Sequence, residues 1–480
     1  MKDIQAKRIR ELRHAKGLSQ KKLADALGIS DRAVSKWEKG LSQPSARNLI
    51  AMAKLLNCSV DAFVGENVGG AESETEEKVA GMQSLTELYK IGRGPSSSHT
   101  IGPERAVMAF LKKNPAADSF RAVLYGSLAK TGKGHGTDEV IRKTFLPYPC
   151  EVVFDCVESN LPHPNTMILY AYREKQEIDR ALVMSVGGGS IAFENTDYQV
   201  PPRPYALATF ADISDYCRDN NLRLWQYVEA VEGEGIHAYM REVWDTMKKS
   251  IVRGLKDEGI LPGGLDVQKK ARALINSQHI DESAETRENR MVCAYAFAVS
   301  EQNAMGETIV TAPTCGASGV LPAVLYYQQQ KNRVSDDRII HALETAGLVG
   351  NLIKTNASIS GAECGCQAEI GSACAMAAVA LAEMFELSID KIEYAAEIAI
   401  EHHLGLTCDP ICGLVQIPCI ERNAVAAMRA INAVSLASFL WDSRKISFDK
   451  VVHTMKETGR DLSVSYKETS EAGLAKLKIK

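Results

Sequence analysis

An acidic run that contains adjacent glycines divides the chain into two unlike parts, and it restricts the possible folds more than any other feature. Residues 66–81 hold five Glu and one Lys among small residues, with Gly69 beside Gly70. Because so few apolar side chains cannot cover a core, this run is predicted to be a flexible linker. The chain is therefore expected to be multidomain, with separate folds on either side of the run.

The composition is that of an ordinary globular protein. The chain has 480 residues, of which 45% are apolar and 24% charged, and at about 100 to 200 residues per domain it has room for two to four domains. No run of about 18 uncharged apolar residues is present, and the first eight residues lack the apolar core of a signal peptide. We therefore expect a cytoplasmic protein that does not cross a membrane. Its 12 cysteines are expected to be thiols and not disulfides, which raises metal binding or thiol chemistry as candidate roles.

The segment before the linker is basic. Residues 1–65 hold 13 Lys and Arg against six Asp and Glu, whereas the whole chain has a net charge of -4. A basic head on an acidic body indicates a nucleic-acid-binding module attached to a different kind of domain.

Helical spacing and stop signals predict five short helices in this head. They are expected at 4–16, 19–27, 32–39, after Pro44, and at Val60 to Val64, with a tight turn at Gly28 between the second and third. This order resembles the phage-repressor and Cro type of helix-turn-helix domain, and the segments Ser19 to Ala24 and Val34 to Glu38 match that family closely. The alternative is a helical bundle that serves only protein contact or dimerisation.

The resemblance implies how the head would contact DNA. In that family the third helix enters the major groove and the start of the second contacts phosphate. Val34 and Trp37 are then expected in the core. The candidate DNA-binding residues are Gln20, Ser30, Arg32, Ser35 and Lys36.

The first part of the body is predicted to be a small α+β domain. Strands are expected at 120–125, 151–157, 166–172 and 181–186, and helices at 104–113 and 138–143. The segment Gly94 to Pro103 is read as a loop of hydroxyls and one imidazole just before a helix. Such a loop suits a carboxylate or a phosphate, and His99 could act as a general base. The alternative is a serine-rich cap with a solvated histidine.

Two glycine-rich segments in the same region are weaker signals. His135 is flanked by glycines next to the start of a helix, and by itself this pattern is a turn. Gly187 to Ser190 follow a strand and could cradle the phosphate of pyridoxal phosphate, although glycines after a strand also make ordinary bends.

From about residue 207 onward the sequence is mainly helical and its cysteines are concentrated. Six of the 12 lie between Cys364 and Cys419, several of them beside Gly or Pro. Their spacings do not match a zinc site built from paired CxxC units, whereas thiolates at turns can converge on a metal centre from separate helices. Cys374 lies within an Ala-Met helical run and is expected to be a buried apolar residue.

At this point the body resembles a known family, the bacterial iron-sulfur L-serine dehydratases. The resemblance extends from 85 to about 475, across both the β-type and the α-type parts of that family. The segments that carry it are 94–103, 186–189, 311–314, 361–371, 401–410 with Arg422 and Asn423, and 466–470.

The resemblance implies a cofactor, a reaction and a set of residues. Three cysteines would hold a 4Fe-4S cluster with one iron open to substrate, and by motif these are Cys366, Cys408 and Cys419, with Cys364 a less favoured substitute for Cys366. L-serine would lose water and then ammonia to give pyruvate. We assign the base to His99, with His135 in reserve. Substrate carboxylate binding is assigned to Ser96, Ser97, Ser98 and Thr100.

The sequence departs from the family pattern in two places. Well-known members end in a cysteine that reaches the cluster, whereas this sequence ends in Lys476 to Lys480, so a resting fourth ligand would be water or another thiol. Cys315 stands where Asn is expected. It is read as a packing residue, with fourth-ligand thiol as the alternative.

The expected organisation is a multidomain chain in four segments. They are an all-α helix-turn-helix head at 1–66, an acidic linker at 67–84, an α+β serine dehydratase β-type domain at 85–206, and a mainly α-helical catalytic α-type domain at 207–480. We expect L-serine and DNA as partners and a homodimer as the assembly. Two alternatives remain, a pyridoxal-phosphate dehydratase and a transcriptional regulator that senses serine or redox state; the choice between serine and threonine stays open.

Overall fold

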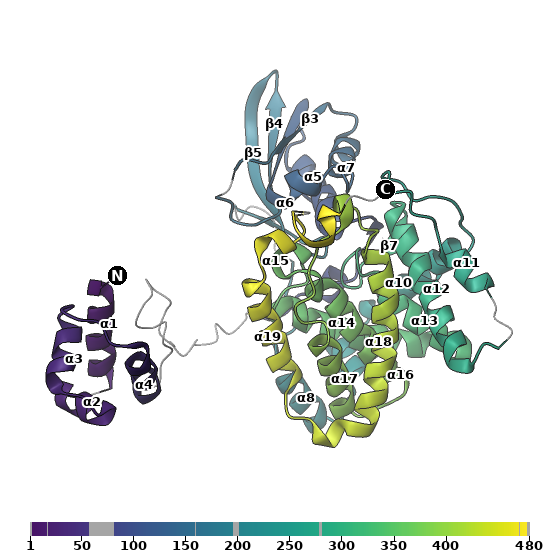
Figure 1. The fold of residues 1–480 in the computed structure, drawn as a ribbon. Helices are drawn as coiled ribbons and strands as arrows, with labels where there is room; N and C mark the ends of the chain where they lie inside the picture. The colour runs from purple at the N-terminus through teal and green to yellow at the C-terminus, as the bar shows by residue number, and fades with distance from the viewer. Residues whose placement is uncertain are drawn as a thin grey trace. The chain divides into compact units, whose positions relative to one another are not determined.

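The computed structural model describes residues 2–16, 18–56, 81–158, 160–194, 201–277, 281–469 and 471–477. The chain forms two compact units, Met1–Val79 and Ala80–Lys480, each shown in Figure 1. The predicted helix Val60 to Val64 and residues 67–80 of the predicted linker lie outside the described residues.

Four helices make up the described part of the first unit: α1 (Lys2–Ala15), α2 (Gln20–Leu27), α3 (Asp31–Glu38) and α4 (Ala46–Leu56). The Ser19 side chain caps α2 by accepting a hydrogen bond from the Lys22 amide at 3.2 Å. Gly28 follows α2 with φ 66°, a left-handed conformation that suits glycine. The prediction that Val34 and Trp37 belong to the core is confirmed, because they are 0% and 6% exposed.

The second unit begins with a mixed sheet of five strands in the order β3-β2-β4-β5-β6. Strand β2 pairs parallel with β3, and the other neighbours pair antiparallel. The bounds of the strands are β2 (Ser119–Tyr125), β3 (Cys150–Asp155), β4 (Thr166–Arg173), β5 (Gln176–Ser185) and β6 (Ile191–Phe193). The four predicted strands are thus confirmed, and β6 was missed because three residues are too few to show alternation.

Three helices accompany this sheet, α5 (Gly102–Lys113), α6 (Gly126–Thr131) and α7 (Thr137–Phe145) (Figure 1). Phe110 of α5, Phe120 of β2 and Phe145 of α7 pack together in the core beneath the sheet, with the rings of Phe120 and Phe145 stacked at 4.3 Å. The predicted helices at 104–113 and 138–143 are confirmed, whereas α6 was not predicted.

A short ribbon joins the sheet-bearing part to the helical part. Strand β1 (Ile91–Arg93) pairs antiparallel with β7 (Thr308–Val310), so residues more than 200 positions apart in the chain become neighbours. This pairing places the segment that follows β1, including Ser96 and His99, against the helical part.

The helical part is built around one fully buried helix. Every residue of α16 (Ser372–Met384) is buried, and α13, α14, α17 and α18 pack around it. The other α-helices of this part are, in chain order, α8 (Phe210–Asp219), α9 (Leu224–Glu232), α10 (Gly235–Gly254), α11 (Ala271–Asn276), α12 (Ala284–Ala304), α13 (Val320–Asn332), α14 (Asp336–Asn356), α15 (Gly361–Cys364), α17 (Ile389–Glu401), α18 (Cys419–Leu440) and α19 (Phe448–Asp461).

Among the described residues, one segment is long and apolar enough to cross a membrane by length and composition alone, Cys419–Ser443. The core helix of a globular protein meets the same criterion. The segment carries Glu421, Arg422 and Arg429, and one side of its helix packs into the helical core through Ala426 and Ala430.

Candidate active site

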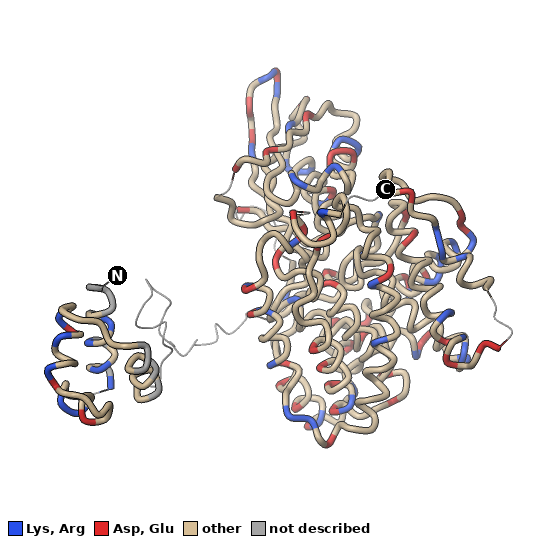
Figure 2. The backbone as a smooth tube through the Cα atoms, viewed as in Figure 1, with Lys and Arg blue, Asp and Glu red and all other residues tan. Residues whose placement is uncertain are grey.

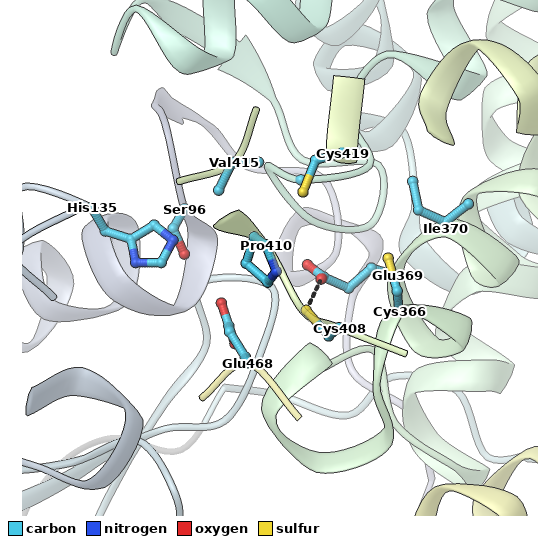
Figure 3. A pocket seen from close by; sticks show the side chains of 11 residues that line it. Ser96, His135, Cys366, Glu369, Ile370, Cys408, Pro410, Val415, Cys419 and Glu468 are labelled. Carbon is cyan, nitrogen blue, oxygen red and sulfur yellow. Dashed lines mark hydrogen bonds between the residues drawn. The ribbon is translucent and has the colours of Figure 1, made fainter. Parts of the chain in front are cut away.

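A cavity in the second unit gathers polar and sulfur-bearing side chains from distant parts of the chain (Figure 3). Residues from the sheet-bearing part, the helical part and the C-terminal segment all reach it. Its lining consists of Ser96, His135, Gly316, Cys366, Glu369, Ile370, Cys408, Pro410, Val415, Cys419 and Glu468.

The three cysteines predicted as metal ligands all line this one cavity. Cys366 directly precedes a single π-helical turn, η4 (Gln367–Gly371), and Cys419 is the first residue of α18. Cys408 lies on extended backbone, where its amide donates to the Tyr466 carbonyl at 2.8 Å. Figure 3 shows the sulfur atoms on one side of the cavity, with Ser96 and His135 on the other.

Glycine allows the two cysteine-bearing loops to approach each other. Gly365 has φ 73°, and a β-carbon there would lie 2.8 Å from the Leu406 carbonyl oxygen. A side chain at this position would therefore separate Cys366 from Cys408.

The electrostatic surroundings favour the thiolate of Cys366 and the neutral thiols of Cys408 and Cys419. The side-chain interaction with Cys408 and the nearby Arg422 guanidinium lower the pKa of the Cys366 thiol against the effect of burial. Interaction with Cys366 and burial raise the pKa of Cys408, and burial raises that of Cys419. Arg422 is held in place by a hydrogen bond to the Thr407 carbonyl at 2.7 Å.

The other cysteines of this region are placed elsewhere. Cys364 packs against Gly459 and lines a different pocket. The Cys374 thiol donates to the Ala426 carbonyl at 3.3 Å inside the helical core, as expected for a buried apolar residue. Cys412 is exposed, and Cys315 is buried beside the cavity without lining it.

Two buried carboxyl groups on the cavity wall were not predicted as site residues. Glu369 approaches the Cys408 sulfur at 4.0 Å, and burial raises its pKa. Burial and Glu369 raise the pKa of Glu468 well above the ordinary range. Both lie in segments that carry the family resemblance, 361–371 and 466–470, but no local pattern distinguishes either of them from a surface carboxylate.

The segment 94–103 is helical where a loop was predicted. Residues Ser97–Ile101 form a π-helical turn that continues directly into α5, and Ser96 caps it by accepting a hydrogen bond from the His99 amide at 3.1 Å. Hydroxyls that bond to local backbone compete with regular α-helix, which explains why the pattern read as a loop. His99 is not solvated; it is 0% exposed.

The residues of this segment have different positions relative to the cavity. Ser96 lines it, while Ser97, Ser98 and Thr100 are buried behind it. The Ser98 hydroxyl lies 2.9 Å from His99 Nδ1, and the Thr100 hydroxyl donates to the His135 carbonyl at 3.2 Å. Two of the four predicted substrate ligands, Ser98 and Thr100, are therefore engaged with the two histidines.

His99 has partners on both ring nitrogens. The Thr131 hydroxyl, which lies 2.9 Å from Nε2, donates its own proton to the Ser127 carbonyl. It can therefore only accept from the ring, which places the His99 proton on Nε2 and leaves Nδ1 to accept from Ser98. Burial, with His135 next, lowers the pKa of His99 well below its usual value, so the ring is neutral.

His135 has one free nitrogen on the cavity wall. Its Nδ1 lies 3.1 Å from the Thr131 carbonyl, which can only accept, so Nδ1 carries the proton and Nε2 has the lone pair. Nε2 is buried and has no hydrogen-bond partner among the described residues. Burial lowers the pKa of His135 to about 4. The two imidazole rings are 4.4 Å apart between centroids.

The glycine-rich segment after β5 packs closely against neighbouring side chains. A β-carbon at Gly189 would lie 2.7 Å from Ile101, and one at Gly188 would lie 2.7 Å from Ile359. Both glycines have positive φ. The glycines thus allow this segment to pack closely against Ile101 and Ile359.

The predicted DNA-binding residues lie on or next to α2 and α3 of the first unit. Arg32 and Lys36 are exposed on α3, Ser30 is exposed at its N-terminus, and Ser35 is half-buried. The Gln20 amide donates to Glu38 at 2.7 Å. Figure 2 marks the Lys and Arg positions along the backbone of this unit in blue. Lys21 and Lys22 of α2 are exposed as well.

Comparison with known proteins matches three family models along the chain. The model described as helix-turn-helix matches residues 9–63, the serine dehydratase beta chain matches 84–145, and the serine dehydratase alpha chain matches 157–475.

Individual relatives match over most of their length. The chain is 39% identical over 452 residues to the L-serine dehydratase of Streptomyces coelicolor, which covers 82% of this chain and 98% of that protein. It is 38% identical over 449 residues to L-serine dehydratase 1 of Escherichia coli, covering 82% and 99%. It is 38% identical over 454 residues to the L-serine dehydratase of Mycobacterium tuberculosis, covering 82% and 97%.

Proposed function

The chain belongs to the L-serine dehydratase family and carries an additional helix-turn-helix domain, and from that premise we propose that it converts L-serine to pyruvate and ammonia with the help of a 4Fe-4S cluster. The observation that carries the proposal is the convergence of Cys366, Cys408 and Cys419 on one cavity opposite Ser96 and His135.

The residues fit an iron-sulfur cluster by the chemistry of their donors. Thiolates are the usual protein ligands of such clusters, and the three thiols come from separate loops on the wall of one cavity. Arg422 would balance the negative charge of the assembled site. When bound, a cluster with one iron coordination position open to substrate supplies a Lewis acid for the β-hydroxyl of serine.

The protein groups on the opposite wall suit the rest of the reaction. We assign the base to His135 instead of the predicted His99, because Nε2 of His135 has a lone pair on the cavity wall whereas both nitrogens of His99 are engaged. His135 Nε2 would take the α-proton of serine, while the bond from the β-carbon to the hydroxyl oxygen breaks and the oxygen leaves as hydroxide; the hydroxide and this proton together make up the water that is lost. The resulting aminoacrylate tautomerises and is hydrolysed to pyruvate and ammonia.

The remaining residues of the segment act through these groups. Ser96 is assigned to the substrate carboxylate because its side chain lines the cavity. Ser98 and Thr100 hold His99 and His135 in place, and His99 packs against the ring of His135. We keep Ser97 in the proposed site as a buried residue of the same turn.

The test is pyruvate formation by full-length protein that is purified without oxygen and reconstituted with iron and sulfide. Turnover of L-serine should require iron and be unaffected by pyridoxal phosphate. Replacement of Cys366, Cys408 or Cys419 by Ser should remove both the cluster absorbance and turnover, whereas Cys374→Ala serves as the matched control. Full activity in iron-free protein would refute the cluster.

We further propose that the head binds DNA and that the chain acts as a homodimer. Basic and polar side chains on α2 and α3 support the first part, namely Gln20, Ser30, Arg32, Ser35 and Lys36. One small basic domain binds weakly, and pairing of two half-sites would supply the specificity. Binding of a labelled duplex by the full-length protein should weaken steeply with salt, and lack of binding at low salt would refute this part.

The helix-turn-helix head also keeps a second candidate open, a regulator that senses serine or redox state through the dehydratase body. Turnover by the reconstituted protein separates the two, because a sensor without catalysis forms no pyruvate. DNA binding that changes with serine, in protein that also turns over, would combine them.

We propose the domain bounds 1–66, 67–84, 85–206 and 207–480. The alpha-chain match begins earlier, at residue 157. We keep the third boundary at 206 because β4, β5 and β6 lie between these positions and complete the sheet that β2 and β3 begin.

A further inference from the structure

Four potential metal ligands meet at a second place in the body, away from the cysteines. They are Glu229 on α9, His237 on α10, and His341 and Glu344 on α14. One ligand atom from each lies within 4.8 Å of every other. None of these residues lines the cysteine cavity.

The conformation of the chain brings these side chains together. His341 and Glu344 are three residues apart on α14, a spacing that places two side chains on the same face of a helix. Helix α9 ends at Glu232, and the chain turns through Gly233, with φ 79°, to begin α10 at Gly235. This short turn sets Glu229 beside His237, with Glu229 Oε1 3.2 Å from His237 Nδ1.

Glu344 is the feature that points to a missing partner. Its side chain is 0% exposed, and neither carboxylate oxygen has a hydrogen-bond partner among the described residues. His237 Nδ1 lies 3.8 Å from its Oε1, beyond hydrogen-bond distance. A buried carboxyl group without donors is costly, and such groups are normally paired or coordinate a metal.

The surroundings of the two histidines fit ligation. The ring of His341 is stacked on Trp225 at 3.7 Å with a 10° angle between the planes, which fixes its orientation. Asp337 lies 3.8 Å from His237 Nε2. Arg241 pairs with the same carboxylate at 2.6 Å and lies 3.4 Å from His237 Nε2, so these two groups hold the far side of the ring in place.

We propose that Glu229, His237, His341 and Glu344 bind one divalent transition-metal ion, with Zn²⁺ as the best match. Two imidazoles and two carboxylates form a donor set of intermediate softness, and four protein ligands leave no position open, which is typical of a structural site. The ion would join α9, α10 and α14. An ion can enter from the surface, because the side chains of His237 and Glu229 are 32% and 35% exposed.

The test compares the full-length protein with Glu344→Gln, which keeps the shape of the side chain and removes its charge. Both proteins retain every cysteine, so zinc bound by thiols contributes equally to each. After dialysis against Zn²⁺ at increasing concentration, the parent should hold one more zinc per chain than the variant. Affinity at this site should fall about 100-fold or more on loss of the ligand, since loss of an outer partner alone costs about 10–100-fold.

Thermal unfolding provides the second measurement. Without metal, Glu344→Gln should be at least as stable as the parent, because it removes a buried carboxyl group that lacks donors. Zn²⁺ should then raise the unfolding temperature of the parent more than that of the variant, by linkage of binding to folding. Glu229→Gln changes a half-buried side chain and should also abolish the extra rise in unfolding temperature that Zn²⁺ causes in the parent. This second variant keeps the test valid if Glu344→Gln does not fold.

A matched control comes from another histidine and glutamate on one helix. His453 Nδ1 lies 3.6 Å from Glu457 on α19, and both side chains are more than half exposed. Glu457→Gln should leave zinc stoichiometry and the thermal shift at the parent values. Equal zinc content and equal shifts in the parent, Glu344→Gln and Glu229→Gln would overturn the proposal.

Discussion

Replacing His135 by Asn should reduce turnover and hardly change stability, whereas replacing His99 by Asn should mainly reduce stability. The Asn amide N–H can take the place of His135 Nδ1, which donates to the Thr131 carbonyl at 3.1 Å. The substitution removes Nε2, which has no hydrogen bond to lose among the described residues. We therefore expect His135→Asn to change the free energy of unfolding by less than about 1 kcal/mol, the typical net value of one hydrogen bond.

The effect of His135→Asn on turnover should be much larger. A positioned general base contributes about 10²- to 10⁴-fold to a rate, so kcat should fall by that factor. His99→Asn should instead mainly lower the free energy of unfolding. Its ring is fully buried and bonded on both nitrogens, through Ser98 and Thr131 among others. Loss of two hydrogen bonds at about 1 kcal/mol each, together with a cavity, should cost about 2 kcal/mol or more.

The assay is pyruvate formation under anaerobic conditions, with kcat divided by cluster content from absorbance, alongside urea unfolding of each variant. A gain of solvent deuterium at the α-carbon of serine gives a direct readout of proton transfer. A His135→Asn protein that keeps its cluster and retains kcat within about threefold of the parent would refute the assignment of the base, because a lost base costs at least about 10²-fold.

Three further outcomes follow from the structure. Cys364→Ser should keep cluster and activity whereas Cys366→Ser should lose both, measured by iron content and pyruvate formation, because only the second thiol lines the cavity. The protein should lose stability as the pH falls from 6.5 toward 4, since burial lowers the pKa of His403 to about 4 and the unfolded chain then binds more protons. His403→Gln should reduce that loss by about 3 kcal/mol in unfolding measurements, and an unchanged pH dependence would contradict it. Lys36→Gln in the full-length protein should lower the slope of DNA affinity against salt by about one, whereas Lys249→Gln in the body should leave it unchanged.

The elements that could be predicted from the sequence are those with a local signal. Alternation of apolar residues predicted β2 and β4. Gly28 and the helical spacing of apolar residues on either side of it predicted α2 and α3. The π-helical turn at Ser97–Ile101 could not be predicted, because its hydroxyl-rich sequence is equally typical of a capped loop.

The candidate site could be predicted only where a motif carried it. The cysteines at 366, 408 and 419 stood in segments that resembled a family, and the structure brings them to one cavity. Glu369 stood in such a segment without being selected, and the Glu344 cluster stood in none, because the significance of these residues depends on burial beside residues that are distant in sequence. The choice between His99 and His135 likewise depended on which nitrogen of each ring was already bonded.

The segment around Glu468 and Leu474 helps to build the cavity. The Glu468 amide donates to the Cys408 carbonyl at 2.9 Å, and the Ser127 hydroxyl donates to the Glu468 carbonyl at 2.9 Å. Asp409, the residue after Cys408, accepts from the Leu474 amide at 2.8 Å and pairs with Arg422. The segment is thus anchored at both the cysteine loop and the sheet-bearing part. Because residues from 96 to 468 must meet before the cavity exists, neither part of the body can form this site alone.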